Sequence, residues 1–323
     1  MAILGIESLG FRVGNIEESA RFFDDLGLAR TSVGTPNEVR YVLAEGSSVI
    51  LRIAAASNSP GSLLPPHGPT ELIWGVEHRR TLDAIADDLS RDRPVSRSDD
   101  GTIRCLDDAG IPIGFRVYQR KPPQDPEQGE NGLSSIKRWN RLRKWYDHAR
   151  PQVLHHTVWG VPNVDEAVAF YTKRLDFRVT DMIRNVGVFM RCDGRPDHHN
   201  LFLHRGQKPF FNHVAFGVEN IDELMTGVNE MQRKGWKSKE GLGRHRMTSI
   251  IFCYFECPAG GSVEYMCDSD YLTDDWEPNL WDSGFANHHW LAQGATHPQA
   301  GESGFRKLPK PLPSFSEASR LPL

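Results

Sequence analysis

The chain has 323 residues, of which 39% are hydrophobic and 25% are charged, and its formal net charge is −4. This composition is typical of a globular protein, and the length predicts two domains. No basic tract or nucleic-acid-binding motif stands out, and no apolar run approaches the roughly 18 residues of a membrane span. Neither a nucleic acid nor a membrane is therefore expected as a partner.

The N-terminus and the cysteines predict the cellular compartment. Residues 1–13 lack the basic start and the long apolar core of a signal peptide. The five cysteines are an odd number and lack the spacing of a disulfide scaffold. Free thiols in a reducing cytoplasm are the simplest account, so a cytoplasmic protein is expected.

An internal repeat predicts the architecture. Three segments share an apolar strand that ends on Val, then an Asn, an aliphatic residue and two acids that begin a helix. These segments are residues 9–23, 157–171 and 214–228. Their asparagines suit helix N-caps, and the acids suit the positive end of the helix dipole. A weaker copy at 71–89 keeps the sequence WGVE but lacks the cap.

Short β-type runs broken by Gly, Asp or Pro follow each helix, so that each unit is predicted to be a βαβββ module. Self-similarity of this kind is stronger evidence of architecture than a single motif. The fold class is therefore predicted to be α+β, with four βαβββ modules paired into two domains. The predicted divisions are a first domain at 1–122, a linker with a short amphipathic helix (136–149) at 123–150, a second domain at 151–270 and a C-terminal tail at 271–323.

Two histidines occupy equivalent positions in the third and fourth modules. Alignment of these modules places His156 on His213, each in a first strand. Small or modest side chains follow on the same strand face and predict a cavity there; they are Val158, Gly160, Ala215 and Gly217. A lone histidine in a strand is usually an ordinary core or surface residue, so the repetition is the informative observation.

Glu264 lies between Val263 and Tyr265 on the predicted last strand of the same module pair. An alternating strand exposes one face, so Glu264 alone would as readily face solvent. A buried carboxylate is usually paired or bound to a metal. Two histidines and a glutamate form the ligand set of non-haem Fe(II) oxygenases, and Mn(II) fits the same donors.

Most of residues 154–270 resemble the type I extradiol ring-cleavage dioxygenases of the vicinal oxygen chelate superfamily. The segments that carry the resemblance are HHTVWGVPNVDEAVAFY, DHHNLFLH, NHVAFGVENIDEL and GRHRMTSIIFCYFECPAGGSVEY. The last is similar to the family signature at Gly243, His245, Tyr254, Pro258, Gly260 and Glu264. It departs from the signature at Cys253 and Cys257.

The resemblance implies roles for individual residues. The positions that match the iron ligands are His156, His213 and Glu264. His199 matches the active-site acid/base, and His245 and Tyr254 match residues that hydrogen-bond the bound diol and the ring-opened intermediate. The adjacent His155 and His198 are expected on the opposite strand faces, with structural roles. The implied cofactor is Fe(II), the implied partners are an aromatic diol and dioxygen, and relatives are commonly homo-oligomers.

The first domain lacks these ligands. Ser8, Glu71 and Gly114 stand where His156, His213 and Glu264 stand in the second domain. One ligand in three does not bind a metal tightly, so the first domain is predicted to be non-catalytic.

The tail and the arginines bear on the substrate. Residues 271–291 resemble the C-terminal extension of the homoprotocatechuate 2,3-dioxygenase and trihydroxytoluene oxygenase branch, which covers the active-site mouth. An apolar strap on the domain surface is an equal alternative. The expected substrate is a substituted or polyhydroxylated monocyclic catechol, and a para-diol such as gentisate or hydroquinone stays open. The arginines considered for binding a ring carboxylate are Arg184, Arg191, Arg244 and Arg246.

Two other functions are compatible with this fold. A glyoxalase-type isomerase would need a fourth ligand near Leu201 or Phe202, and neither side chain can bind a metal. A metal-free binding protein would have no need of the two histidines and the glutamate. The presence of His199, His245 and Tyr254 favours oxygen chemistry over both.

Overall fold

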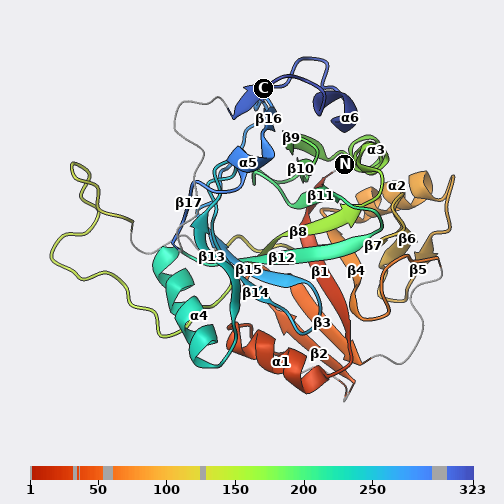
Figure 1. Cartoon of the computed structure of the whole chain (residues 1–323). Coiled ribbons are helices and arrows are strands. Elements are labelled where there is room, and N and C mark those ends of the chain that lie inside the picture. Colours follow the sequence, from red (N-terminus) through yellow and green to blue (C-terminus); the bar gives the residue numbers. More distant parts are fainter. Residues whose placement is uncertain (1, 32–34, 36, 54–60, 124–128, 293–303) are drawn as a thin grey trace.

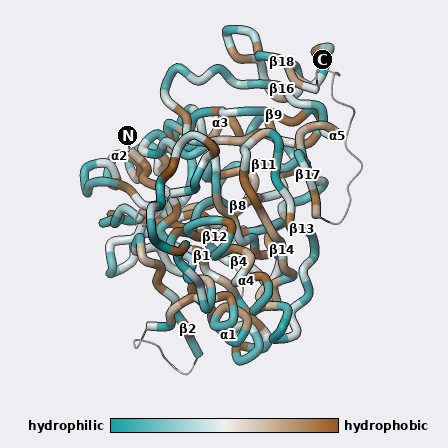
Figure 2. The backbone as a smooth tube through the Cα atoms, turned by 90° about the vertical axis from the view of Figure 1, so that its left-hand side faces the viewer, coloured by the Kyte–Doolittle hydropathy of each residue, from teal (hydrophilic) through white to brown (hydrophobic). Residues whose placement is uncertain are grey.

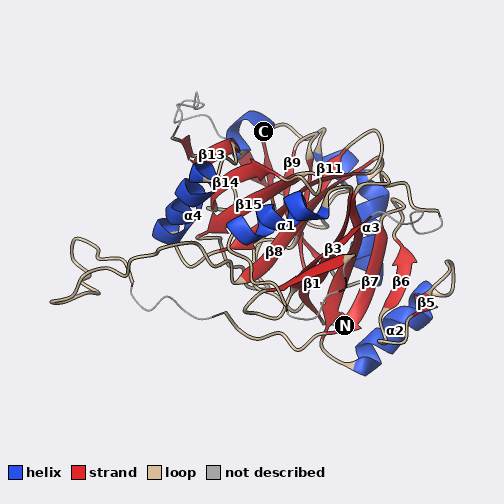
Figure 3. Ribbon diagram, turned by 90° about the horizontal axis from the view of Figure 1, so that it is seen from below, coloured by secondary structure: helices blue, strands red, loops and turns tan. Residues whose placement is uncertain are grey.

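The computed structural model describes residues 2–31, 35, 37–53, 61–123, 129–292 and 304–323. It is an α+β fold whose described residues form two mixed sheets, one of seven strands and one of eleven, and helices pack against inner strands of both sheets (Figures 1 and 3). Among the described residues, no helix is long and apolar enough to cross a membrane. The five cysteines are all buried and free, as their spacing predicted.

The first sheet has the strand order β2-β3-β1-β4-β7-β6-β5. Its strands are β1 (Ile3–Val13), β2 (Glu38–Val42), β3 (Ser48–Ile53), β4 (Gly68–Val76), β5 (Ser96–Arg97), β6 (Ile103–Leu106) and β7 (Pro112–Val117). The helices of this half are α1 (Ile16–Asp25) and α2 (Arg79–Leu89). Among the described residues of the first module, β2 and β3 follow the helix as strands, and Arg30 forms an isolated bridge to Tyr41.

The second sheet has the order β17-β13-β14-β15-β12-β8-β11-β10-β9-β16-β18. Its module strands are β8 (Val153–Val161), β9 (Arg178–Ile183), β10 (Gly187–Arg191), β11 (Leu201–Arg205), β12 (Phe210–Gly217), β13 (Ser238–Arg244), β14 (Ile251–Glu256) and β15 (Ser262–Cys267). The helices of these modules are α3 (Val164–Arg174) and α4 (Ile221–Arg233). Both sheets therefore place the first strands of their two modules side by side, β1 with β4 and β8 with β12.

Matching strand registers support the repeat alignment. In the second sheet, Ala215 pairs with His156 on one side and with Glu264 on the other. In the first sheet, Ile73 pairs with Ser8 on one side and with Gly114 on the other. The positions compared in the sequence are therefore equivalent in the structure.

The predicted helix caps are present. Asn15, Asn163 and Asn220 are N-caps whose side chains accept backbone N–H groups in the first turn. In the weaker copy, His78 is the N-cap of α2 and makes no side-chain capping bond. The structure therefore confirms that this helix lacks a side-chain cap, as the sequence predicted.

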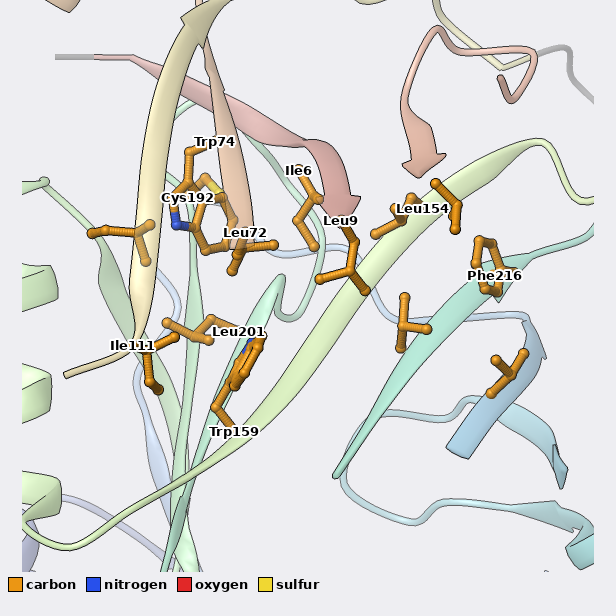
Figure 4. Close-up of a cluster of buried hydrophobic side chains, with 14 of the residues drawn as sticks. Ile6, Leu9, Leu72, Trp74, Ile111, Leu154, Trp159, Cys192, Leu201 and Phe216 are labelled. Atoms are coloured by element: carbon orange, nitrogen blue, oxygen red, sulfur yellow. The ribbon is translucent and has the colours of Figure 1, made fainter. Parts of the chain in front are cut away.

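A single hydrophobic cluster contains residues of both sheets. Figure 4 shows Leu9 and Trp74 from the first half near Leu154, Trp159 and other residues of the second half. In Figure 2 hydrophobic stretches follow interior strands, whereas many connecting loops are hydrophilic. Because the two halves share this core, each contributes to the stability of the other.

The helix predicted at 136–149 is absent, so that prediction was wrong. Residues 129–145 instead form an irregular segment that extends away from the body (Figures 1 and 3). A short helix is marginal unless it buries an apolar face. Here Trp139, Leu142 and Trp145 are 72%, 77% and 84% exposed, so no packing surface supports the helix.

The tail joins the second sheet. β16 (Asn279–Trp281) pairs with β9 and with β18 (Phe305–Lys307), and β17 (Trp290–Leu291) pairs with β13. Two short helices, α5 (Ser283–Ala286) and α6 (Phe315–Ala318), complete it. Part of the predicted tail, 293–303, lies outside the described residues.

Candidate active site

Three strands of the second sheet bring His156, His213 and Glu264 together. Nε2 of His156 lies 3.2 Å from Oε2 of Glu264, and Nε2 of His213 lies 3.2 Å from the same oxygen. The two Nε2 atoms are 3.3 Å apart. All three side chains are largely or fully buried. They are the group of potential metal ligands found among the described residues.

The strand register explains how residues so distant in sequence converge. Ala215 lies opposite both His156 and Glu264. His213 is two residues before Ala215, and side chains two apart share a strand face. The three potential ligands therefore face the same side of the sheet.

The donor set fits a divalent metal ion. Neither carboxylate oxygen of Glu264 accepts a well-oriented hydrogen bond, although the side chain is fully buried. An orphaned buried carboxylate is costly unless a cation neutralises it. Adjacent ligands about 2.1 Å from an octahedral ion lie about 3 Å apart, which matches the observed donor spacing.

The electrostatics hold these groups in the protonation states that a metal requires. Burial lowers the pKa of His156 to about 4, which leaves a neutral imidazole at neutral pH. Burial alone would raise the pKa of Glu264, but His156 and His213 outweigh it and hold that pKa below its usual range. Metal ligands must be neutral imidazoles and ionised carboxylates.

His199 lies directly before β11 and beside the potential metal site. Its ring centroid is 4.1 Å from that of His156. Burial, and then the neighbouring histidines, lowers the pKa of His199 well below its usual value. His199 is therefore a neutral imidazole that can accept a proton at neutral pH.

His245 and Tyr254 form a hydrogen-bonded pair on the other side of His213. Nδ1 of His245 lies 2.7 Å from the carbonyl oxygen of Asn287 in the tail, so Nδ1 carries the proton. Nε2 then accepts from the Tyr254 hydroxyl at 3.2 Å. Burial raises the pKa of Tyr254 well above its usual value, so the hydroxyl stays protonated.

A cavity of about 240 Å³ adjoins these side chains. Its wall is largely apolar on one side, with Val158, Ile183, Val186, Phe189, Phe202, Met247 and Ile250. Its polar lining includes His156, His199, His213, His245, Tyr254, Asn212, Lys239, Glu240, Asn287 and His288. The cavity therefore combines the potential metal ligands, the candidate catalytic residues and an apolar surface.

Only part of the expected cavity wall is correct. Val158 lines the cavity, but Gly160, Ala215 and Gly217 do not. The space above Gly160 is filled by the ring of Phe210, since a Cβ on Gly160 would lie 1.8 Å from it. A small side chain leaves a cavity only where no distant side chain fills the space.

The four arginines considered for a substrate carboxylate are committed elsewhere. Arg184 donates to the carbonyl oxygen of Leu321, and Arg246 donates to that of His288. Arg191 donates to a backbone carbonyl and to Asp274. Arg244 donates to a backbone carbonyl and to Asp268. Among the described residues, the cavity is lined by Lys239 and by no arginine. Lys239 could not be predicted from the sequence, because β13 has no periodic pattern that marks its inner face.

The position that a fourth ligand would occupy is apolar. Glu264 pairs with Ala215, which is two residues after His213. In the same way Phe202 pairs with Val158, which is two residues after His156. Phe202 is therefore the counterpart of Glu264 in the other module. The ring of Phe202 stacks on Phe189 and lines the cavity. In the first sheet the equivalent of Glu264 is Gly114, where a Cβ would lie 2.5 Å from Ile73.

His155 and His198 do not simply face away from the site. Nδ1 of His155 lies 2.9 Å from Nδ1 of His156, and Nδ1 of His198 lies 3.3 Å from Nδ1 of His199. Each expected structural histidine is therefore bonded to a candidate functional one.

Comparisons with known proteins agree with this geometry. Residues 153–265 match the family model described as the Glyoxalase/Bleomycin resistance protein/Dioxygenase superfamily. The chain is 30% identical over 175 residues to "Metapyrocatechase 2" of Cupriavidus necator, a match that covers 54% of this chain and 55% of that protein. The chain thus spans about half the length of this curated relative.

Two solved structures share the fold. The Mn(II)-bound glyoxalase from Novosphingobium aromaticivorans superposes with a TM-score of 0.71 at 21% identity, covering 93% of this chain and 96% of that one. An extradiol ring-cleaving dioxygenase from B. fuscum gives 0.71 at 18% identity, covering 90% of this chain and 79% of that one. Together with the family match, these likenesses confirm the resemblance noted in the sequence. The likeness to the glyoxalase/bleomycin resistance protein/dioxygenase superfamily thus lies in residues 153–265, the part of the chain that carries the candidate site.

Proposed function

We propose that the chain is an Fe(II)-dependent extradiol dioxygenase, which opens the ring of an aromatic diol with dioxygen during the breakdown of aromatic compounds. The observation that carries the proposal is the site itself. Three protein ligands, His156, His213 and Glu264, adjoin a cavity that also holds His199, His245 and Tyr254. A curated relative at 30% identity is a metapyrocatechase by name, which supports the same reaction.

The site disfavours the other two functions. An isomerase with four protein ligands would need a donor where Phe202 stands. A metal-free binding protein would leave the buried oxygens of Glu264 without a partner, at a substantial free-energy cost. Three ligands leave coordination positions open for a diol and dioxygen.

A bound Fe(II) ion would lower the pKa of the diol hydroxyls and let electron density pass from the ring to dioxygen. The chain's own residues would then move protons and exclude water. The Nδ1 of His199 faces His198, so its Nε2 is the nitrogen left to exchange a proton with the substrate. The Tyr254 hydroxyl, held by His245, can turn to hydrogen-bond a substrate oxygen.

The cavity favours one substituted ring. A cavity of about 150 Å³ suffices to hold benzene, and the cavity here is about 240 Å³. The apolar wall around Phe189 and Phe202 suits the ring and an alkyl group, and Lys239 at the cavity edge offers a positive charge. We therefore infer a substituted or polyhydroxylated monocyclic diol, with a para-diol as the alternative to be tested.

The test is anaerobic reconstitution with Fe(II), followed by oxygen uptake and absorbance scans. The diol panel comprises catechol, 4-methylcatechol, homoprotocatechuate, 2,3-dihydroxybiphenyl, a trihydroxytoluene and gentisate. A ring-fission chromophore with one dioxygen consumed per diol is expected. The activity should be lost in His213→Ala. It should be kept in His148→Ala, which changes a partly exposed histidine of the linker that does not line the cavity.

Each other result has a definite meaning. Iron bound without oxygen uptake on any diol would reject the dioxygenase and favour the isomerase. No metal bound at all would favour the binding protein. Reconstitution with Mn(II) in parallel would decide which metal supports turnover.

We also propose that the chain forms a homo-oligomer. The linker segment carries Leu133, Trp139, Leu142 and Trp145 fully or largely exposed. Exposed apolar side chains gathered on one segment mark interaction sites. Sedimentation velocity should show a defined oligomer, and the double variant Trp139→Ser/Trp145→Ser should shift it toward monomer; a wild-type monomer would reject the proposal.

A further inference from the structure

His198 connects the candidate acid/base to a buried carboxylate. Its Nδ1 lies 3.3 Å from Nδ1 of His199, and its Nε2 lies 3.3 Å from Oδ2 of Asp181. His198 and Asp181 are fully buried, and His199 is 3% exposed. The three groups form one continuous hydrogen-bonded line that ends at the cavity.

This line fixes which nitrogen of His199 carries the proton. A carboxylate only accepts hydrogen bonds, so Nε2 of His198 is the donor to Asp181. If His198 holds a single N–H, it is the one that donates to Asp181, so Nδ1 of His198 accepts and Nδ1 of His199 donates. Nε2 of His199 is then unprotonated, with a lone pair free for the substrate.

We propose that His198 and Asp181 are positioning residues that hold His199 in its Nδ1–H tautomer, so that Nε2 accepts the proton of a bound substrate hydroxyl. The inference rests on the proposed function, since the bound hydroxyl is that of the proposed substrate. The tautomer of His199 can nevertheless be measured without any catalytic turnover. An outer partner that fixes the tautomer and orientation of a functional histidine is a recurrent device in enzymes.

The tail fixes Asp181. Oδ1 of Asp181 accepts from the backbone N–H of Asn279 at 2.6 Å and from its side-chain amide at 3.0 Å. Oδ2 accepts from Nε1 of Trp281 at 2.8 Å. These bonds come from β16, which pairs with β9 at Asp181 itself. Asp181 therefore has a single orientation, in which Oδ2 faces His198.

A second pair of adjacent histidines lies beside the potential metal ligand His156. Nδ1 of His155 lies 2.9 Å from Nδ1 of His156, and Nε2 of His155 lies 3.5 Å from Oδ1 of Asp197. Asp197 is itself held by Arg195. Nε2 of His155 has no hydrogen-bond partner among the described residues, so this pair does not fix a tautomer as the line through His198 does.

The first readout is the tautomer itself. Full-length protein with ¹⁵N-labelled histidine is loaded with Zn(II), which is diamagnetic, and long-range ¹H–¹⁵N correlation spectra identify the protonated nitrogen of His199. Wild type is expected to show the Nδ1–H form. Asp181→Asn and His198→Phe, which change the buried end and the middle of the line, are expected to shift His199 toward the Nε2–H form. The matched control Asp268→Asn changes a carboxylate that is bonded to Arg244 away from the cavity and should leave the tautomer unchanged.

The second readout is the split between kcat and KM in the Fe(II)-loaded enzyme. Asp181→Asn and His198→Phe should lower kcat about 10–100-fold, the usual effect of losing an outer hydrogen-bond partner, with little change in KM. His198→Gln keeps an oxygen that can accept from Nδ1 of His199, so it should retain most of kcat. Circular dichroism confirms the fold of each variant, and the two positions give independent variants should one fail to fold.

The outcomes separate the two proposals. If wild type shows the Nδ1–H tautomer and the variants lose it, the positioning role of His198 and Asp181 is supported, even if no diol is cleaved. The absence of diol cleavage would reject only the proposed dioxygenase activity. A wild-type His199 in the Nε2–H form would overturn the inference. So would ring cleavage with kcat unchanged in both Asp181→Asn and His198→Phe.

Discussion

The indole N–H of Trp281 donates to Oδ2 of Asp181 at 2.8 Å, although the two residues are 100 positions apart. Asp181 lies on β9 of the third module, and Trp281 lies on β16 of the tail. The bond is fully buried, so its loss would leave an unpaired polar group. The described part of the tail is therefore a structural part of the second sheet and reaches the cavity through Asn287 and His288.

Glu264→Gln should abolish tight metal binding. The substitution keeps the size of the side chain but removes the negative charge that the two histidines cannot supply. We expect the Kd for Mn(II) to rise by more than about 100-fold, beyond the effect of losing an outer partner of a ligand. Isothermal titration of metal-free protein measures it. Glu256→Gln, at the exposed end of β14, is the control; equal affinities in both variants would remove Glu264 from the metal site.

Phe202→Ala should widen the substrate range. Its ring lines the cavity and stacks on Phe189 at 4.1 Å between centroids. Removing it should raise kcat/KM for 2,3-dihydroxybiphenyl relative to 4-methylcatechol by about tenfold or more, because a pocket discriminates by the volume it offers. The stability loss should be about 3–5 kcal/mol.

Phe255→Ala is the matched control for this change. Phe255 is fully buried in the shared core and does not line the cavity. It should lose similar stability, measured by urea unfolding, without a change in substrate preference. A parallel shift in both variants would mean that loosened packing, and not cavity volume, sets the preference.

Asp107 should make stability depend on pH. Burial raises the pKa of Asp107 to about 6, while its carboxylate accepts bonds from two backbone N–H groups and from the hydroxyl of Tyr171. Because the folded state holds the proton more tightly, the stability that this group contributes is present below pH 4 and is lost as the pH rises through 6. The loss should be on the order of 3 kcal/mol.

Comparison with Asp107→Asn isolates this effect. The amide retains an oxygen for the two N–H groups but does not titrate. The free energy of unfolding of wild type relative to the variant should therefore fall between pH 4 and 7, measured by urea unfolding at several pH values. Asp108→Asn, a half-exposed neighbour that pairs with Arg93, should not reproduce the trend. A constant difference between wild type and Asp107→Asn would show that Asp107 titrates normally.

The helix caps should respond in opposite directions. The side chain of Asn15 accepts the backbone N–H of Glu18 at 3.0 Å, so Asn15→Ala should destabilise the protein by about 1 kcal/mol. His78 caps α2 without a side-chain bond, so His78→Asn should stabilise it by about 0.5–1 kcal/mol. Thermal unfolding measures both. Destabilisation by His78→Asn would show that the imidazole makes a contribution that capping does not describe.

Much of the site could be predicted from the sequence because the modules repeat. His156 and His213 occupy the same position in successive modules, and the strand registers turn that equivalence into spatial proximity. Glu264 follows from the same register. The helix caps were equally predictable, since a cap is a local interaction within four residues.

The failures share a physical cause. The helix expected at 136–149 has apolar side chains at helical spacing, but nothing in the fold covers them. The cavity expected beside Gly160 is filled by Phe210, which lies 50 residues away. Lys239 lines the cavity, whereas the four arginines considered do not. Neither the composition nor the spacing of residues in the sequence contains that information.

The sequence by itself determined the modules, their pairing and the three potential metal ligands, because repeat position and strand periodicity encode them locally. Tertiary structure alone decided what surrounds those ligands. Nε2 of His198 bonds to Asp181, and Asp181 is held in turn by Trp281 of the tail, 100 positions further along the chain. Such contacts depend on how sheets and tail pack together, and packing brings side chains within hydrogen-bonding distance irrespective of their separation in sequence.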